Sequence, residues 1–165
     1  MDPIDQRLVH ALQRDCKTPL AKLGELVCLS APAVMERVRK LEQTGVIRGY
    51  TALVDARSVG LDVTAFVGVS VASPAHIESF EHAISPLPEV LECHHVTGAH
   101  TLLLKVKARN TAGLEKLIKT LRAIDGTTRT ETMVVLSTAK EDVALPLDAS
   151  PLPAPKRALR RVQST

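Results

Sequence analysis

Residues 18–45, TPLAKLGELVCLSAPAVMERVRKLEQTG, constrain the fold of this chain more than any other segment. Apolar residues recur there at helical spacing in two runs that a short connection separates. Thr18 followed by Pro19 favours a helix start, because a hydroxyl caps free backbone N–H groups and proline suits the first helical position. Ser30 starts the second run in the same way, and Gly45 is a plausible stop. The spacing predicts a helix-turn-helix, whose second helix lies in the DNA major groove.

The flanking residues extend this pair of helices to a three-helix module. Asp2 and Pro3 favour the start of an earlier helix that has its own apolar stripe. The run VIRGYTALV after Gly45 is β-rich and stands where a wing would be. Three helices and a small β-wing make a winged helix-turn-helix. On the segment alone, an ordinary helical hairpin with a solvated basic face stays the alternative.

In the second helix, the predicted DNA contacts are the residues off the apolar stripe. Val34, Val38 and Leu41 form that stripe and face inward. The first turn is mostly small and can approach DNA through its backbone N–H groups, and the cationic residues can bind phosphates or bases. Glu36 either accepts from cytosine N4 or weakens affinity. The predicted contacts are Ser30, Ala31, Pro32, Ala33, Met35, Glu36, Arg37, Arg39 and Lys40.

Composition limits the classes of protein that the chain can represent. A length of 165 residues allows one domain or two small ones, and a hydrophobic content of 45% allows real cores. No apolar run approaches the roughly 18 residues of a membrane span, and we expect no signal peptide at the N-terminus. Cys16, Cys28 and Cys93 are widely spaced without a CxxC pair. We therefore expect small buried residues in a reducing cytoplasm rather than disulfides or a zinc site.

The charge is unevenly distributed along the chain, whose formal net charge is +3. Residues 1–54 hold 8 Lys or Arg and 6 Asp or Glu, residues 55–144 hold 9 and 11, and residues 145–165 hold 4 and 1. A module that faces DNA, joined to a middle module that does not, would have this distribution. The last segment is rich in proline as well as basic residues, which is typical of a flexible extension.

The middle segment predicts alternating strands and helices. Residues 63–72, VTAFVGVSVA, alternate strictly, as in a strand with one buried face. Further strands are expected at 89–97, 101–108 and 129–138, and amphipathic helices follow the first and third strands. The order β-α-β-β-α-β is that of a ferredoxin-like sandwich. The fold class is therefore α+β, with a winged helix-turn-helix (1–54), a linker (55–62), a βαββαβ domain (63–144) and a Pro-rich basic tail (145–165).

Both faces of the predicted sheet are substantially apolar, although the two helices cover only one of them. A second subunit is the usual cover, so we expect a dimer through this domain, with loops or the tail over the sheet as the alternative. RNA-recognition modules share this topology but stack bases on sheet aromatics. The aromatics here are Tyr50, Phe66 and Phe80, and only Phe66 falls on the sheet, which excludes that class.

Four runs of the sequence carry a resemblance to a known family. They are DPIDQRLVHALQRD, LSAPAVMERVRKLEQTGVIRGYTALVD, VLECHHVTGAHTLLLKV and TRTETMVVLS, and together they span nearly all of residues 1–140. They are similar to the Lrp/AsnC (leucine-responsive, feast–famine) family of prokaryotic transcription regulators. The resemblance implies a sequence-specific DNA-binding regulator in the cytoplasm with a C-terminal effector-binding and oligomerisation domain of the RAM type. Its partners would be double-stranded DNA with a pseudo-palindromic operator, further copies of the chain as dimer and octamer, and a small effector that is commonly an amino acid.

The same resemblance implies an effector site between the second and third strands. The family's loop has an acidic or amide residue after its glycine, then an aromatic residue and often an aspartate, whereas this chain has Ala99, His100 and Thr101. Without the carboxylate, the usual partner of an amino group is missing, so the effector is different, weakly bound or absent. By analogy with the family, two residues of the last strand belong to the same site. Their alternative role is cross-strand packing. The implied effector residues are Thr97, Gly98, Ala99, His100, Thr101, Thr130 and Thr132.

Metal and enzyme classes find little support in the sequence. His94 and His95 are adjacent in a strand and point to opposite faces, although Glu92 shares a face with His94, so no metal site is expected. No GxGxxG, Walker loop or nucleophile elbow is present, so neither an enzyme nor a cofactor is expected. His100 allows a mild pH response. The remaining alternative is a small-molecule sensor or feedback subunit that keeps the βαββαβ domain and does not bind DNA.

Overall fold

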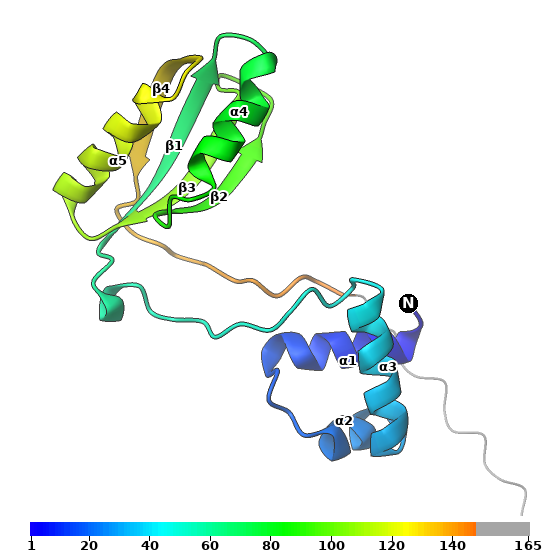
Figure 1. Ribbon diagram of the computed structural model, residues 1–165. Coiled ribbons are helices and arrows are strands. Elements are labelled where there is room, and N and C mark those ends of the chain that lie inside the picture. Colours follow the sequence, from blue (N-terminus) through cyan, green and yellow to red (C-terminus); the bar gives the residue numbers. More distant parts are fainter. Residues whose placement is uncertain (148–165) are drawn as a thin grey trace, which may run out of the picture. The chain divides into compact units, whose positions relative to one another are not determined.

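The computed structural model describes residues 1–147, which divide into two compact units (Figure 1). One unit consists of residues 1–52 together with residues 141–147, and the other is Leu53–Lys140. The tail predicted over 145–165 lies outside the described residues from position 148. No helix among the described residues is long and apolar enough to cross a membrane.

Residues 1–52 of the first unit form three helices around a small apolar core. They are α1 (Pro3–Arg14), α2 (Leu20–Val27) and α3 (Ala31–Gln43). The core consists of Leu8 from α1, Leu23 and Val27 from α2, and Val34 from α3, all at most 2% exposed. Each such side chain stabilises the fold by about 1.5–3 kcal/mol relative to full exposure. The helix-turn-helix predicted from the apolar spacing is thereby confirmed.

The helix starts and ends expected from the sequence agree with the structure at Ser30 and Gly45 and differ at Thr18. The Ser30 hydroxyl accepts a hydrogen bond from the Ala33 N–H at 3.4 Å, so the predicted cap of α3 is confirmed. Gly45, with φ +73°, follows the end of α3 as expected. The predicted Thr18 cap is wrong: Pro19 holds the cap position of α2, and the Thr18 hydroxyl donates backward to the Asp15 carbonyl at 2.8 Å.

The β-wing expected after Gly45 is not formed within the described residues, because residues 46–54 contain no strand. A strand needs a partner that takes up its backbone groups. The Ile47 N–H instead donates to the Leu41 carbonyl at 3.0 Å and closes the end of α3. Residues 46–54 are β-rich in composition, but the described residues of the first unit contain no strand with which they could pair.

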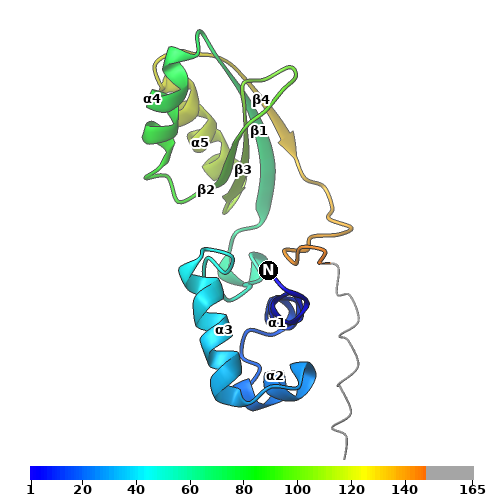
Figure 2. The same cartoon turned by 90° about the vertical axis from the view of Figure 1, so that its right-hand side faces the viewer.

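The second unit is a four-stranded antiparallel sheet covered by two helices. Its strands are β1 (Val63–Val71), β2 (Val90–His95), β3 (Leu102–Ala108) and β4 (Thr127–Val134), in the order β2-β3-β1-β4. The helices α4 (Ala75–Ile84) and α5 (Thr111–Ala123) both lie against one face (Figures 1 and 2). A short 3₁₀ helix, Arg57–Val59, precedes the sheet. The predicted βαββαβ order is confirmed, and the Asn110 side chain caps α5.

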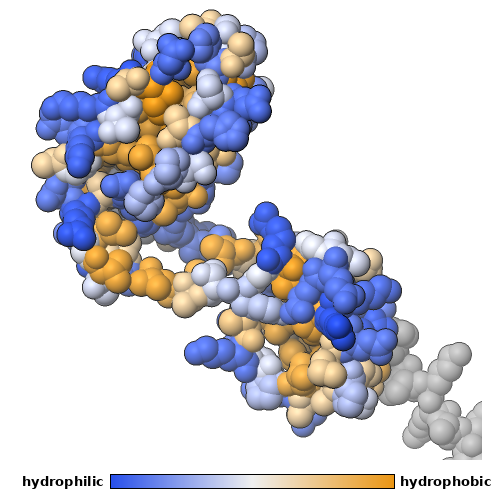
Figure 3. All heavy atoms as spheres, in the orientation of Figure 1, coloured by the Kyte–Doolittle hydropathy of each residue, from blue (hydrophilic) through white to orange (hydrophobic). Residues whose placement is uncertain are grey.

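The two sheet faces differ in what covers them. Alternate residues of β1, namely Ala65, Val67 and Val69, are fully buried beneath α4 and α5. In the orientation of Figure 3, hydrophilic side chains cover much of the outer side of these helices, and apolar ones lie between them. No helix among residues 1–147 covers the opposite face, which we call the open sheet face. It carries Phe66, Gly68, Leu103, Lys105, Glu131 and Met133.

The cysteines are less buried than the sequence led us to expect. Cys16 and Cys28 are exposed, so the expectation is wrong for both; they lie after a helix end and in a turn, where the small core of the first unit does not reach. Cys93 is half-buried, and burial, with a smaller effect from Glu81, raises the pKa of its thiol.

Candidate DNA-binding and effector sites

The turn between α2 and α3 depends on two residues with special backbone requirements. A side chain at Gly24 would collide with the backbone carbonyl of Leu29, and the Gly24 carbonyl accepts the Leu29 N–H at 3.0 Å. Cys28 adopts a left-handed conformation with φ 56°, which costs a non-glycine residue roughly 1–2 kcal/mol. The sequence indicated a short connection here. It did not single out Gly24, whose position inside a helical run was the available signal.

The outer face of α3 carries most of the predicted DNA contacts. Val34 and Leu41 are buried on the inner face, whereas Met35 is 56% exposed. Arg39 and Lys40 are exposed, and neither forms an ion pair with another residue in the range 1–147. Cations free of internal partners can bind phosphates or base edges. Of the other predicted contacts, Ser30, Pro32 and Glu36 are exposed, and Ala31 and Ala33 are half-buried.

Arg37 occupies a different position from the other cations of α3. Its Nη1 lies 2.7 Å from Asp2 Oδ2 and 2.8 Å from Asp5 Oδ1. These carboxylates also form the capping box of α1, in which each accepts a hydrogen bond from the other residue's backbone N–H. Arg37 therefore fastens α3 to the start of α1. From the sequence we predict the same DNA-contacting role for Arg37 as for Arg39 and Lys40. The acidic partners of Arg37 lie too far along the chain for helical spacing to indicate them.

The contacts of Arg37 affect the ionisation of Asp2 and of Arg37 itself. Burial alone would raise the pKa of Asp2, but hydrogen bonds from the Asp5 backbone and from Arg37 outweigh it and hold that pKa below the ordinary value. The hydrogen bonds to Asp2 and Asp5 raise the pKa of Arg37 in turn. The carboxylate form of Asp2 is thus favoured.

The predicted effector loop lies at the end of β2. Thr97, Gly98 and Ala99 are exposed, and Gly98 has φ +123°, a conformation that favours glycine. Thr101 is half-buried, and its N–H donates to the Val69 carbonyl at 2.9 Å. The loop therefore has an exposed tip and a base held against β1.

His100 folds back from this loop over the open sheet face. Its side chain is 13% exposed and packs on Gly68, where a Cβ would collide with the imidazole. Its Nδ1 lies 3.4 Å from Ser70 Oγ, and its Nε2 lies 3.4 Å from Glu131 Oε2. The imidazole thus fills space that a longer side chain at position 68 would occupy.

The structure does not bring the two halves of the predicted effector site together in one chain. Thr130 pairs with Val69 and Thr132 pairs with Val67, so both threonines lie on the helix-covered face. His100 lies over the opposite face. One subunit alone cannot bring His100 together with Thr130 and Thr132 in one pocket, because the sheet itself stands between them.

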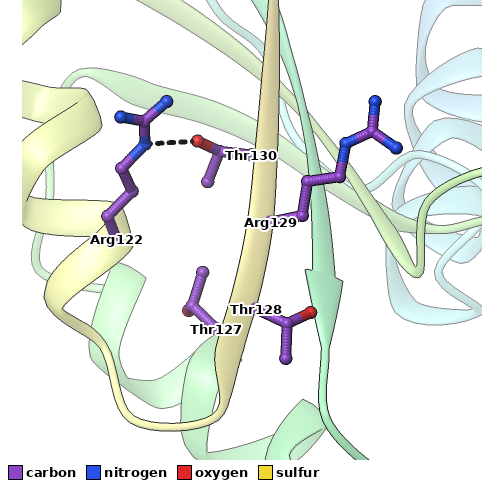
Figure 4. Close-up of a pocket in the computed structure, with 5 residues that line it drawn as sticks. All are labelled: Arg122, Thr127, Thr128, Arg129 and Thr130. Atoms are coloured by element: carbon purple, nitrogen blue, oxygen red, sulfur yellow. Dashed lines mark hydrogen bonds between the residues drawn. The ribbon is translucent and has the colours of Figure 1, made fainter.

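A pocket of about 370 Å³ lies beside β4 and the end of α5 (Figure 4). Arg122 and Thr127–Thr130 line it. The Arg122 Nε donates to Thr130 Oγ1 at 2.7 Å, and Arg129 extends to the other side of β4, where it pairs with Glu131 at 3.0 Å. The sequence indicated Thr130 by analogy only and did not indicate Arg122.

His94 of β2 belongs to a polar cluster on the open sheet face. His94 Nε2 lies 3.2 Å from Glu92 Oε2, and Lys105 Nζ lies 3.3 Å from Glu92 Oε1. The hydrogen bond with His94, and then that with Lys105, lowers the pKa of Glu92 despite partial burial. Residues 1–147 contain no group of three or more His, Cys, Asp or Glu that could hold a metal ion.

Both units match families of known domains. Residues 1–42 match the AsnC-type helix-turn-helix domain, and residues 64–145 match the Lrp/AsnC ligand binding domain. The leucine-responsive regulatory protein of Rhizobium meliloti is 36% identical over 86% of this chain and 92% of its own length. The HTH-type transcriptional regulator FL11 of Pyrococcus horikoshii is 32% identical over 89% and 97%, respectively.

Solved structures have the same fold over nearly the whole chain. A transcriptional regulator from Neisseria meningitidis, solved as a complex with L-Met, has a TM-score of 0.85 at 29% identity and covers 90% of this chain and 97% of its own. AsnC of Escherichia coli has a TM-score of 0.82 at 29% identity, with coverage of 88% and 99%. Both likenesses extend across the helical unit and the sheet.

Proposed function

The chain belongs to the Lrp/AsnC family of transcription regulators, and we propose that it controls transcription by binding specific DNA sites through α3. The observation that carries this proposal is the outer face of α3, where Arg39 and Lys40 are exposed without internal ion pairs. A cytoplasmic location follows from the proposal, because a prokaryotic regulator acts where the DNA is. We assign no catalytic role.

The residues of α3 take different parts in this proposal. The first turn, Ser30 to Ala33, approaches a phosphate with its backbone N–H groups at a helix N-terminus. Arg39 and Lys40 contact phosphates or base edges. Met35 packs against the base edges, and Glu36 selects cytosine at one position. Arg37 positions the helix and does not itself contact DNA, because Asp2 and Asp5 hold its guanidinium.

We propose that the open sheet face forms the dimer interface. Phe66, Leu103 and Met133 share this face, and Met133 is 46% exposed in the single chain. Exposed apolar side chains on an open sheet face are stabilised by burial against a second copy. A two-fold dimer binds pseudo-palindromic sites, with half-sites about 34–36 Å apart or at multiples of that spacing. Assembly of dimers to an octamer follows from the family.

We further propose a small-molecule effector, of which an amino acid is the leading class. The Neisseria meningitidis relative and a feast or famine regulatory protein of Mycobacterium tuberculosis were solved with L-methionine. Our site consists of the loop Thr97–Thr101 of one subunit and Thr130 and Thr132 of another. This arrangement accounts for their separation by the sheet within one chain.

The salt dependence of binding to duplex DNA tests the DNA-binding proposal. Affinity for native upstream DNA should fall with salt at a log–log slope of about −0.9 per phosphate contact. Arg39→Ala should reduce the magnitude of the slope by about 0.9 or lower the affinity about tenfold, according to whether it contacts a phosphate or a base. Lys119→Ala is the matched control, because Lys119 lies on α5 and pairs with Glu115 at 2.6 Å.

Two outcomes contradict parts of this proposal. Unchanged affinity in Arg39→Ala removes that residue from the interface. No binding at low salt removes DNA recognition altogether and leaves the sensor or feedback subunit, which would use only the βαββαβ domain.

A further inference from the structure

The pocket beside β4 has a chemical character that the effector proposal does not yet specify. We propose that Arg122 and the free edge of β4 bind the carboxylate of a small organic acid. This inference rests on the proposed effector function and names the class of ligand. It makes the regulator responsive to organic anions, including those that lack an amino group.

Arg122 is held in place while most of its guanidinium stays available. Its Nε donates to Thr130 Oγ1 at 2.7 Å, and this bond holds the planar group between α5 and β4 (Figure 4). The structure gives its two terminal nitrogens no acidic partner among the described residues. A guanidinium with two free nitrogens matches the two oxygens of a carboxylate, and such charge-assisted pairs are about twice as strong as neutral ones.

The backbone of β4 adds donors on the same side. The Val135 N–H donates to the Thr64 carbonyl at 2.9 Å, which fixes the alternation of bonds between β1 and β4. In an antiparallel pair, the intervening residues direct their N–H and C=O groups away from the partner strand. Thr130 is one of these, and β4 is the edge of the sheet, so its N–H points toward open space. A ligand oxygen can accept from this N–H as well as from Arg122.

The charges around the pocket select an anion and provide no carboxylate to pair with an ammonium group. Arg122 and Thr127–Thr130 line the pocket, and this set contains no carboxylate. Glu131 points to the other face, where it contacts Arg129 and His100. The loop Thr97–Thr101 has no acidic residue to contribute from a neighbouring subunit. A ligand with a carboxylate and no amino group therefore loses little here.

Calorimetric titration of the full-length chain with succinate, L-methionine and inorganic phosphate tests this inference, at constant ionic strength. Succinate should bind at least as tightly as L-methionine and more tightly than phosphate. Arg122→Gln should weaken succinate binding about tenfold or more, because charged hydrogen bonds are lost. Thr130→Val should weaken it less, since the guanidinium stays but loses its anchor. Lys119→Gln, on the same helix, should bind like the wild type.

The outcomes separate this inference from the proposed function. Absent succinate binding, a requirement for the amino group, equal binding of phosphate, or unchanged binding in Arg122→Gln overturns the carboxylate site. DNA affinity measured without ligand is independent of all four results. A chain that binds DNA but not succinate fails only here, and one that binds succinate but not DNA fails only as a regulator.

Discussion

Replacement of Arg37 by methionine tests whether this residue positions α3 or contacts DNA. Methionine keeps much of the apolar stem and removes the charge, so packing along the helix changes little. The change leaves Asp2 and Asp5 side by side without their shared cation. We expect the helical unit to become less stable, and we expect DNA binding to weaken through misplacement of α3 and not through a lost phosphate contact.

The magnitude follows from the exposure of the three side chains. Arg37 is 34% exposed, Asp5 18% and Asp2 44%, so solvent screens the contacts partly. Ion pairs at such sites contribute about 0.2–1 kcal/mol each. Two contacts, with the remaining carboxylates repelling each other, give an expected loss of about 1–2 kcal/mol in the free energy of unfolding at neutral pH.

The pH dependence of this loss provides a second measurement. The folded-state pKa of Asp2 lies below its ordinary value of 3.8. Its contribution is therefore fully present above that value and is lost as the pH falls through the lower, folded pKa. The difference in stability between wild type and Arg37→Met should shrink as the pH falls below about 3.8, because protonated carboxyl groups no longer need the cation.

Tyrosine fluorescence during urea denaturation measures this effect in the correct unit. The chain has no tryptophan and a single tyrosine, Tyr50, which lies in the helical unit. Arg39→Met is the matched control, because Arg39 is exposed on the same helix and has no ion pair among the described residues. It should leave stability unchanged and reduce the magnitude of the salt slope of DNA binding by about 0.9 if it contacts a phosphate.

Arg37 has no positioning role if Arg37→Met unfolds at the wild-type urea concentration, or if its lost stability is the same at pH 3 and pH 7. A reduced salt slope with unchanged stability would return Arg37 to the DNA interface. Asp5→Asn in the Arg37→Met chain should regain part of the loss, since it removes the repulsion between the two carboxylates.

Three further perturbations test local features of the two units. Burial, and then the hydrogen bond to Glu42, raises the pKa of Tyr50 to about 12. Its near-ultraviolet absorbance should therefore stay largely that of the neutral phenol at about pH 11. Glu42→Gln should shift the ionisation of Tyr50 to lower pH. Gly24→Ala should destabilise the helical unit by about 1–3 kcal/mol and weaken DNA binding, because its methyl would collide with the carbonyl in the turn; wild-type urea unfolding would contradict this. Gly68→Ala should displace the imidazole of His100 and lower the melting temperature, and a second change, His100→Ala, should restore part of it; no recovery in the double variant would mean that the clash lies elsewhere.

Local patterns predicted the framework well because their causes are local. The alternation of residues 63–72 gave the buried face of β1, since side chains of a strand alternate whatever lies on either side. Ser30 could be assigned as a cap because its hydroxyl and the Ala33 N–H that donates to it are only three residues apart. The wing was wrong for the opposite reason: strand formation depends on a partner that composition cannot supply.

The candidate sites were less predictable because they depend on distant pairs. Arg37 meets acidic groups 32 and 35 residues away, so helical spacing could only class it with Arg39. The separation of Thr130 from His100 depends on the register of β1 against β4, which pairs Val69 with Thr130. The sequence indicates which residues of one strand share a face. It does not indicate the register, which decides how the faces of two strands correspond.

The C-terminal segment after β4 changes how the helical unit can be delimited. The side-chain amide of Gln13 on α1 pairs with Leu145 in both directions, donating to its carbonyl at 3.2 Å and accepting its N–H at 2.6 Å. The sheet is thus an insertion within a discontinuous helical unit, which resumes at Glu141. A chimera that exchanges one sensory module for another needs two junctions, and a fragment that stops after residue 52 leaves Gln13 without its backbone partner.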